Sequence, residues 1–111
     1  MTNFRLTSRI FDLDDSRELT AFKYDLSFDI YTSFEQDLAA SSSSVALSMG
    51  PVGTAGLIVL RTDNPITVSV CDAAEPFTVE DVMILAGVDV ATELDVVAID
   101  GARVQVFIAG A

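Results

Sequence analysis

The sequence predicts an all-β fold, an antiparallel β-sandwich or jelly roll of about eight short strands. Three observations predict it. Apolar and polar residues alternate strictly over residues 20–32, as in a strand with one buried face. Two β-type runs flank the polar break Thr62–Pro65, and an Asp100-Gly101 pair separates two further apolar runs. Asn-Pro and Asp-Gly pairs are typical of tight turns between strands.

Residues 1–19 are mixed and polar, with apolar residues spaced along them. This pattern predicts an extended arm or an edge strand, followed by a turn at Asp12–Ser16. Phe4, Leu6 and Ile10 are candidate interface anchors if the segment is an arm. In an edge strand the same side chains pack on the protein's own sandwich, and both interpretations fit the sequence.

The alternation over residues 20–32 predicts one long strand that begins the sandwich domain. Its apolar positions are expected to face the core; they are Phe22, Tyr24, Leu26, Phe28 and Ile30. Tyr31 falls on the opposite, polar face. It is therefore a candidate for an exposed aromatic contact.

The next segment is polar and poor in strand signals. Ser33–Gln36 has the spacing of a helix capping box, so a short helical turn over 34–40 competes with a loop, which the sequence favours. Ser41–Ser44 is a serine tract typical of loops. Val45–Met49 alternates as a short strand, and Gly50–Gly53 is expected to turn.

The run Leu57–Leu60 is continuously apolar, which predicts a strand buried on both faces. The run that starts at Ile66 alternates, which predicts one buried face. It ends at Cys71, the only cysteine, which we interpret as an ordinary strand residue because its sequence neighbours do not lower a thiol pKa. A loop is expected over Asp72–Pro76.

The C-terminal part continues the β pattern. Phe77–Ala86 is compatible with a helix start, but its β-branched and aromatic content favours a strand. Asp95–Ile99 and Ala102–Ala109 are predicted to form a hairpin around Asp100-Gly101. In the last strand Phe107 lies on the polar face, and it joins the candidate interface residues.

The 111 residues fit one domain, divided into an arm over 1–19 and a sandwich over 20–111. Mean hydropathy is +0.46, yet no apolar run approaches the about 20 residues that span a bilayer, and the N-terminus lacks the apolar core of a signal peptide. Such hydropathy in a short chain predicts burial against other subunits. We expect no membrane association.

The net charge is −11, and it is carried entirely by residues 24–111. Nucleic-acid binding is not expected, because affinity for nucleic acids comes from neutralising phosphates. The acidity serves solubility, or it lets an acidic body dock through its neutral N-terminal segment onto a basic surface.

The sequence offers little catalytic chemistry. It contains no histidine, which removes the commonest general base. The acidic stretch from Asp12 departs from a calcium loop, with Arg17 at the glycine position and Lys23 at the final glutamate position. Glu80 and Asp81 are adjacent, so on a strand they point to opposite faces and do not converge on one bond. We expect no catalytic residue, no metal and no cofactor.

Two stretches carry a family resemblance: Leu-Ile-Val-Leu-Arg-Thr-Asp-Asn-Pro-Ile-Thr-Val over 57–68, and Asp-Gly-Ala-Arg-Val-Gln-Val-Phe-Ile-Ala-Gly over 100–110. In them the chain resembles small β-sandwich virion proteins of tailed bacteriophages. The resemblance extends over residues 20–111. It implies a structural part of a capsid, neck or tail, present in many copies, and it transfers no functional residues.

The expected function is that of a non-enzymatic virion structural protein, a capsid decoration or a neck or tail component. Its expected partners are itself and other virion proteins, and its location is the virion, after synthesis in the host cytoplasm. The alternative is a small module that binds a carbohydrate or another host-surface ligand. That alternative predicts exposed aromatic side chains, for which Tyr31 and Phe107 are the candidates.

Overall fold

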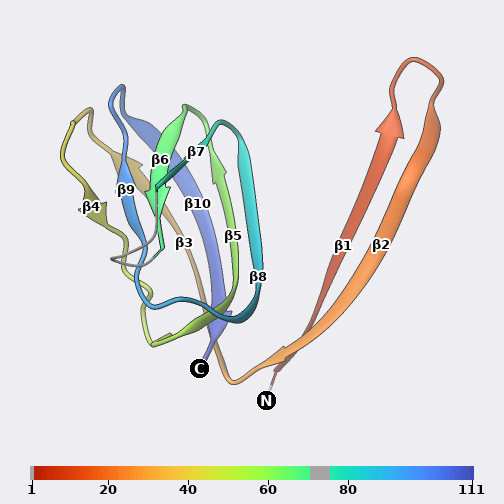
Figure 1. Ribbon diagram of the computed structural model, residues 1–111, viewed down its shortest axis with the longest axis horizontal. Helices are drawn as coiled ribbons and strands as arrows, with labels where there is room; N and C mark the ends of the chain where they lie inside the picture. The colour runs from red at the N-terminus through yellow and green to blue at the C-terminus, as the bar shows by residue number, and fades with distance from the viewer. Residues whose placement is uncertain (1, 71–75) are drawn as a thin grey trace.

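The computed structural model describes residues 2–70 and 76–111, and over them the chain is all-β with antiparallel pairing throughout. The predicted fold class is confirmed, with ten strands where about eight were expected. The strands (Figure 1) are β1 (Thr2–Asp12), β2 (Arg17–Phe28), β3 (Ile30–Leu38), β4 (Val45–Ala46), β5 (Ala55–Thr62), β6 (Ile66–Ser69), β7 (Phe77–Val79), β8 (Val82–Ala91), β9 (Asp95–Val97) and β10 (Ala102–Gly110).

Strands β3 to β10 form a sandwich of two sheets. The long sheet has the order β3-β10-β5-β8, and the short sheet has the order β4-β9-β6-β7. The core lies between them, because the alternating apolar positions of both sheets point inward. Its largest fully buried side chains are Ile58, Leu60, Ile66, Val68, Leu94, Val96, Val104 and Ile108.

The predicted burial patterns of three strands are confirmed. β5 lies inside the long sheet between β10 and β8, so it is buried almost throughout, as its continuous apolar run predicts. β6 buries alternate residues, and β10 turns Val104, Val106 and Ile108 to the core while Arg103 and Gln105 stay exposed. The Gly50–Gly53 turn is also confirmed: Gly50 has a φ of 58°, and the amide of Val52 donates to the carbonyl of Met49.

β1 and β2 form a separate two-stranded hairpin that stands away from the sandwich (Figure 1). They pair from Thr2 opposite Phe28 to Asp12 opposite Arg17, with one irregularity after Ile10. The hairpin meets the sandwich only at its base, near both ends of the chain, and its outer part diverges from the body. The segment expected to be an arm or an edge strand therefore contains β1, the hairpin tip and the start of β2.

The prediction of one long strand over residues 20–32 is wrong. It is two strands, separated at Asp29, whose amide donates to the carbonyl of Gly110. Only β3 belongs to the sandwich, so Phe22 and Tyr24 are about half exposed instead of lying in the core. Alternation gives a strand one apolar face, but it does not determine what covers that face.

The prediction of a hairpin around Asp100-Gly101 is also wrong. A turn is present, with the Gly101 amide donating to the carbonyl of Ala98, but β9 lies in the short sheet and β10 in the long sheet. A two-residue type I′ turn needs a positive φ at both central residues. Here Gly101 has a φ of 76° and Asp100 is not in that region. The pair therefore forms a corner between sheets.

Three smaller expectations need correction. Residues 34–38 continue strand β3, so the loop or helical turn expected there is absent. The strand over Val45–Met49 is reduced to Val45–Ala46, and Phe77–Ala86 is two strands, of which β8 runs on to Ala91. Cys71 and most of the loop expected after it lie outside the described residues.

Candidate functional site

Four aromatic rings join the base of the hairpin to the outer face of the long sheet. Phe4 of β1 contacts the rings of Tyr31 and Phe107 edge to face, at centroid distances of 5.3 and 5.5 Å. Phe28 of β2 lies 6.2 Å from Phe4, and Tyr31 stacks on Phe107 at 6.1 Å. Aromatic pairs at these distances are favourable beyond the area that they bury. The cluster therefore anchors the hairpin on the sheet.

Gly56 of β5 has no side chain, and this leaves room for the aromatic cluster. Phe28 lies directly over Gly56, where an added Cβ would collide with the ring. Beside it, Leu57 and Ala109 are buried although they do not belong to the core cluster between the sheets. The two residues pair across β5 and β10 and face outward. The hairpin base thus covers this end of the outer face.

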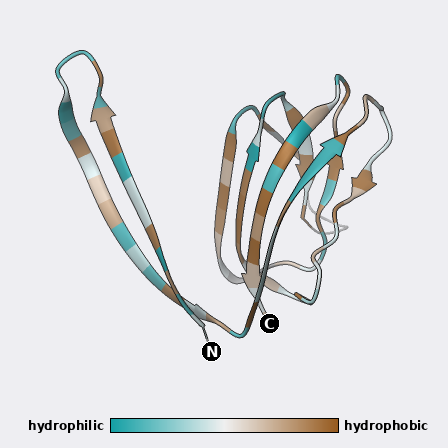
Figure 2. Ribbon diagram, turned by 180° about the vertical axis from the view of Figure 1, so that it is seen from behind, coloured by the Kyte–Doolittle hydropathy of each residue, from teal (hydrophilic) through white to brown (hydrophobic). Residues whose placement is uncertain are grey.

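Beyond its base the hairpin keeps one apolar face. Directly paired residues of antiparallel strands point to the same side, so β1 and β2 together form this face. We call it the hairpin apolar face; it consists of Phe4, Leu6, Ile10, Phe22, Tyr24, Leu26 and Phe28. Ile10, Phe22 and Tyr24 are 52%, 50% and 48% exposed. Figure 2 shows brown (apolar) and teal (polar) segments along both strands of the hairpin.

The opposite face of the hairpin is polar and is held by ion pairs. The Arg5 guanidinium donates to both oxygens of Asp25, at 2.7 and 3.1 Å. Arg9 donates to Glu18 at 2.8 Å. The hydrogen bond from Arg5 lowers the pKa of the Asp25 carboxyl below its usual value. These pairs keep the two strands in register on the side that faces water.

The turn at the hairpin tip uses its acidic residues for local structure. A carboxylate oxygen of Asp12 accepts hydrogen bonds from the amides of Asp14 and Asp15, at 2.9 and 3.4 Å. Leu13 at the tip is 90% exposed. No group of three or more Cys, Asp or Glu side chains within residues 2–70 and 76–111 is placed to hold a metal ion.

The outer face of the long sheet continues from the aromatic cluster as an apolar surface. We call this the outer patch; it consists of Val59, Val82, Ile84 and Phe107. Val82 and Ile84 on the edge strand β8 are 54% and 45% exposed, and Val59 and Phe107 are half-buried. A shallow hollow of about 440 Å³ lies next to it, between Ser33, Val59 and Phe107.

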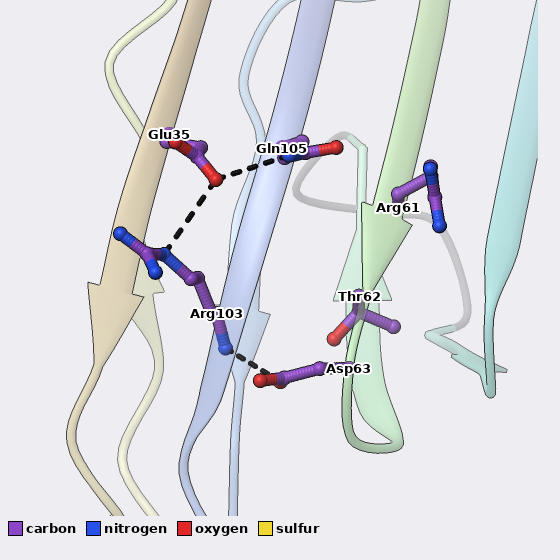
Figure 3. Close-up of a pocket in the computed structure, with 6 residues that line it drawn as sticks. All are labelled: Glu35, Arg61, Thr62, Asp63, Arg103 and Gln105. Carbon is purple, nitrogen blue, oxygen red and sulfur yellow. Dashed lines mark hydrogen bonds and ion pairs between the residues drawn. The ribbon is translucent and has the colours of Figure 1, made fainter.

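The far end of the same face is polar (Figure 3). Gln105 donates to Glu35 at 3.0 Å, and Arg103 lies 3.5 Å from Glu35 and 3.4 Å from Asp37. Arg61 lies beside them and has no polar partner among the described residues. The Glu35 carboxylate is thus engaged by an amide and a guanidinium, and these contacts join β3 to β10.

The structure brings together three of the five predicted interface residues. Phe4, Tyr31 and Phe107 meet at the hairpin base, while Leu6 and Ile10 lie further out on the same hairpin face. Sequence reasoning missed the contribution of β2 to this face. The alternation from residue 20 was the signal, but it was assigned to the core.

Comparison with known protein families, curated proteins and solved structures finds no match to this chain. The described residues contain no helix long and apolar enough to span a bilayer.

Proposed function

We propose that the chain is a non-enzymatic structural component of a tailed-bacteriophage virion, a capsid decoration or a neck or tail part, that acts by assembling with itself and with other virion proteins. One observation carries the assembly part of this proposal. The hairpin of strands β1 and β2 projects from the sandwich with an uncovered apolar face.

A projecting hairpin of this kind needs a partner. Two strands alone are at best marginally stable in water, because they have no third strand or second layer to bury their apolar side chains. Here the half-exposed rings of Phe22 and Tyr24 stand along the outer part of the hairpin. Covering them with another protein would stabilise the hairpin and explain why a short acidic chain has positive mean hydropathy.

The virion part of the proposal rests on the resemblance of residues 57–68 and 100–110 and on the chemistry of the surface. The chain has no histidine. In a polar hollow on the long sheet, Glu35 contacts both Arg103 and Gln105. Such a surface suits docking better than catalysis.

Two measurements test this function. Mass spectrometry of purified phage particles is expected to find the chain in a fixed number of copies relative to the major capsid protein. Light scattering of the purified chain is expected to show self-association between about 1 and 300 μM, because assembly follows mass action. A chain that is absent from particles and remains monomeric without binding any virion protein contradicts the proposal.

The carbohydrate-binding alternative rests on Tyr31, which is 52% exposed on the outer face. Its ring already packs against Phe4 and Phe107, however, and Phe107 is half-buried beneath them. The remaining strongly exposed rings of the described residues are Phe11, Phe22 and Tyr24, all on the hairpin. A glycan array distinguishes the two functions: binding that is lost in Tyr31→Ala would favour the alternative.

A further inference from the structure

We infer that the hairpin of one copy lies with its apolar face on the outer patch of a second copy, so that the chain assembles by exchanging hairpins. This inference rests on the proposed assembly function and names the partner, the surface that inserts and the surface that receives it. Both surfaces belong to the same chain, so each copy supplies one of each.

The receiving surface continues a contact that the chain already makes with itself. At the hairpin base, Phe4 and Phe28 of the apolar face lie on Phe107 and Gly56 of the long sheet. Val59 pairs with Phe107 on one side and with Ile84 on the other. Phe107, Val59 and Ile84 thus form one row across β10, β5 and β8. The hairpin base already contacts this row at Phe107, and the outer patch continues from there.

The two surfaces match in chemistry. From Phe4 to Ile10 the hairpin apolar face carries no charged side chain, because Arg5 and Asp25 alternate onto the other side. The ionic pair Asp12 and Arg17 lies beyond Ile10, at the hairpin tip. The four members of the outer patch are uncharged; Phe107, Val59 and Ile84 form one cross-strand row, and Arg61 lies in the next row, directly paired with Val82. Docking on the row of Phe107, Val59 and Ile84 therefore places no charged side chain of that row under the hairpin apolar face, which avoids a main cost of burying a polar interface.

The hairpin supplies the larger of the two surfaces. β1 has 11 residues, and at about 3.3 Å per residue and about 4.8 Å between strands the hairpin covers roughly 350 Å² of a facing surface. Phe4 and Phe28 at the hairpin base already lie on the chain's own sheet, so the area free for a second copy is smaller than this. Reciprocal exchange, which covers one hairpin face and one sheet face on each copy, therefore buries less than the about 800 Å² per partner of a standard interface. Reciprocal exchange gives a two-fold dimer, and exchange in one direction gives a ring if the rotation between copies closes and an open filament if it does not.

Cross-linking between chains tests this arrangement. One chain carries Tyr24→Cys, and a second, distinguishable by a tag, carries Ile84→Cys; both carry Cys71→Ser. When the two full-length chains are mixed and oxidised, a disulfide-linked heterodimer is expected. The matched control replaces Tyr24→Cys by Lys23→Cys, which lies on the polar face of β2. It is expected to cross-link at least about tenfold less, because adjacent strand residues point to opposite faces.

A second variant tests the receiving face without cross-linking. Ile84→Asp places a charge in the outer patch and is expected to weaken self-association by about tenfold or more, because a buried unpaired charge is costly. Ser43→Asp adds the same charge in an exposed loop and is expected to have little effect. Circular dichroism of both variants confirms that the fold is kept.

The outcomes separate this inference from the proposed function. If light scattering shows an oligomer but the mixed chains give no cross-link, the inference of hairpin exchange is wrong and the proposed assembly function is retained. If a chain carrying both cysteines closes on itself at monomer mass, the hairpin folds onto its own sheet and the inference is wrong. A monomer that still binds other virion proteins contradicts the inference alone, and a monomer that binds none contradicts both.

Discussion

At the scale of single residues, Asp63 and Asn64 connect the end of β5 to the start of β10. A carboxylate oxygen of Asp63 accepts from the amide of Arg103 at 2.7 Å, and the Asn64 side chain donates to the carbonyl of Gly101 at 3.0 Å. Thr62 is buried, and its hydroxyl donates to the carbonyl of Asn64 at 2.6 Å. The Thr-Asp-Asn-Pro motif thus holds a corner where the chain passes from the long sheet to the short sheet.

Replacement of Asp63 tests this role. Asp63→Ala removes the acceptor for the Arg103 amide and is expected to lower the free energy of unfolding by about 1 kcal/mol. Asp63→Asn keeps a carbonyl oxygen at the same place and is expected to lose less. Urea unfolding of the three proteins measures the difference. Equal stability of Asp63→Ala and the natural protein would show that the hydrogen bond does not hold the corner.

Gly110 permits the closest approach of two backbones at the end of the long sheet. A Cβ at this position would collide with the carbonyl oxygen of Thr54 and would lie 2.9 Å from the Cα of Ala55. Both obstacles are backbone atoms, so Gly110→Ala is expected to cost about 1–3 kcal/mol. Gly53→Ala is the control, because its Cβ would meet only the Ala111 carbonyl at 3.4 Å. Thermal unfolding that ranks the two variants equally would contradict this.

Residue patterns predicted burial well where a strand lies inside a sheet. The continuous apolar run of β5 and the alternation of β10 both gave the correct inward side chains. The same alternation was misleading at Phe22 and Tyr24, since a period of two identifies an apolar face without identifying its neighbour. Phe4, Tyr31 and Phe107 were chosen separately from the sequence, and only the fold could show that their rings meet.

At the scale of elements, the hairpin is held on its polar side by exposed ion pairs. The hydrogen bond from Arg5 lowers the pKa of Asp25 in the folded protein. A lowered folded pKa means that the pair stabilises the hairpin above the ordinary pKa of aspartate, and that this contribution is lost as the pH falls through the folded value.

An NMR titration of Asp25 tests this pair. The midpoint in the natural protein is expected below the usual aspartate value of about 3.9, and Arg5→Gln is expected to move it back towards that value. Arg9→Gln is the matched control, because Arg9 pairs with Glu18 and not with Asp25. An Asp25 midpoint that does not change in Arg5→Gln would show that the two side chains are not paired in solution.

Deletion of β1 separates assembly from folding. No member of the core cluster, and none of the side chains packed against it, precedes Ile30, so removal of residues 1–11 is expected to leave cooperative unfolding intact. The loss of Phe4 from the outer face is expected to cost about 1–3 kcal/mol. Self-association is expected to disappear, as measured by light scattering. Loss of cooperative unfolding would place β1 in the folding unit of the sandwich.

The connections between elements were less predictable than the elements themselves. Most strands of the sandwich were expected near their observed positions, but the Asp100-Gly101 turn and the Thr62–Pro65 turn both pass between sheets. A turn motif specifies a local reversal of the chain. Whether the two strands then pair depends on the twist and length of the sheets on either side, which a single sequence pattern does not contain.

At the scale of the whole molecule, the chain combines a strongly acidic composition with exposed apolar surfaces. The net charge of −11 resides in residues 24–111, so two copies that approach each other experience repulsion between their bodies. The hairpin apolar face and the outer patch carry none of this charge. Association is therefore expected to be driven by apolar burial and opposed by long-range electrostatics.

The dependence of self-association on salt follows from this balance. The Debye length is about 10 Å at 0.1 M salt and about 3 Å at 1 M, so added NaCl screens the repulsion between acidic bodies while leaving apolar burial in place. The dissociation constant is expected to fall roughly threefold or more between about 0.05 M and 0.5 M NaCl. Sedimentation at several protein concentrations measures it. A dissociation constant that rises with salt would mean that the basic residues of the hairpin, rather than its apolar face, make the contact between copies.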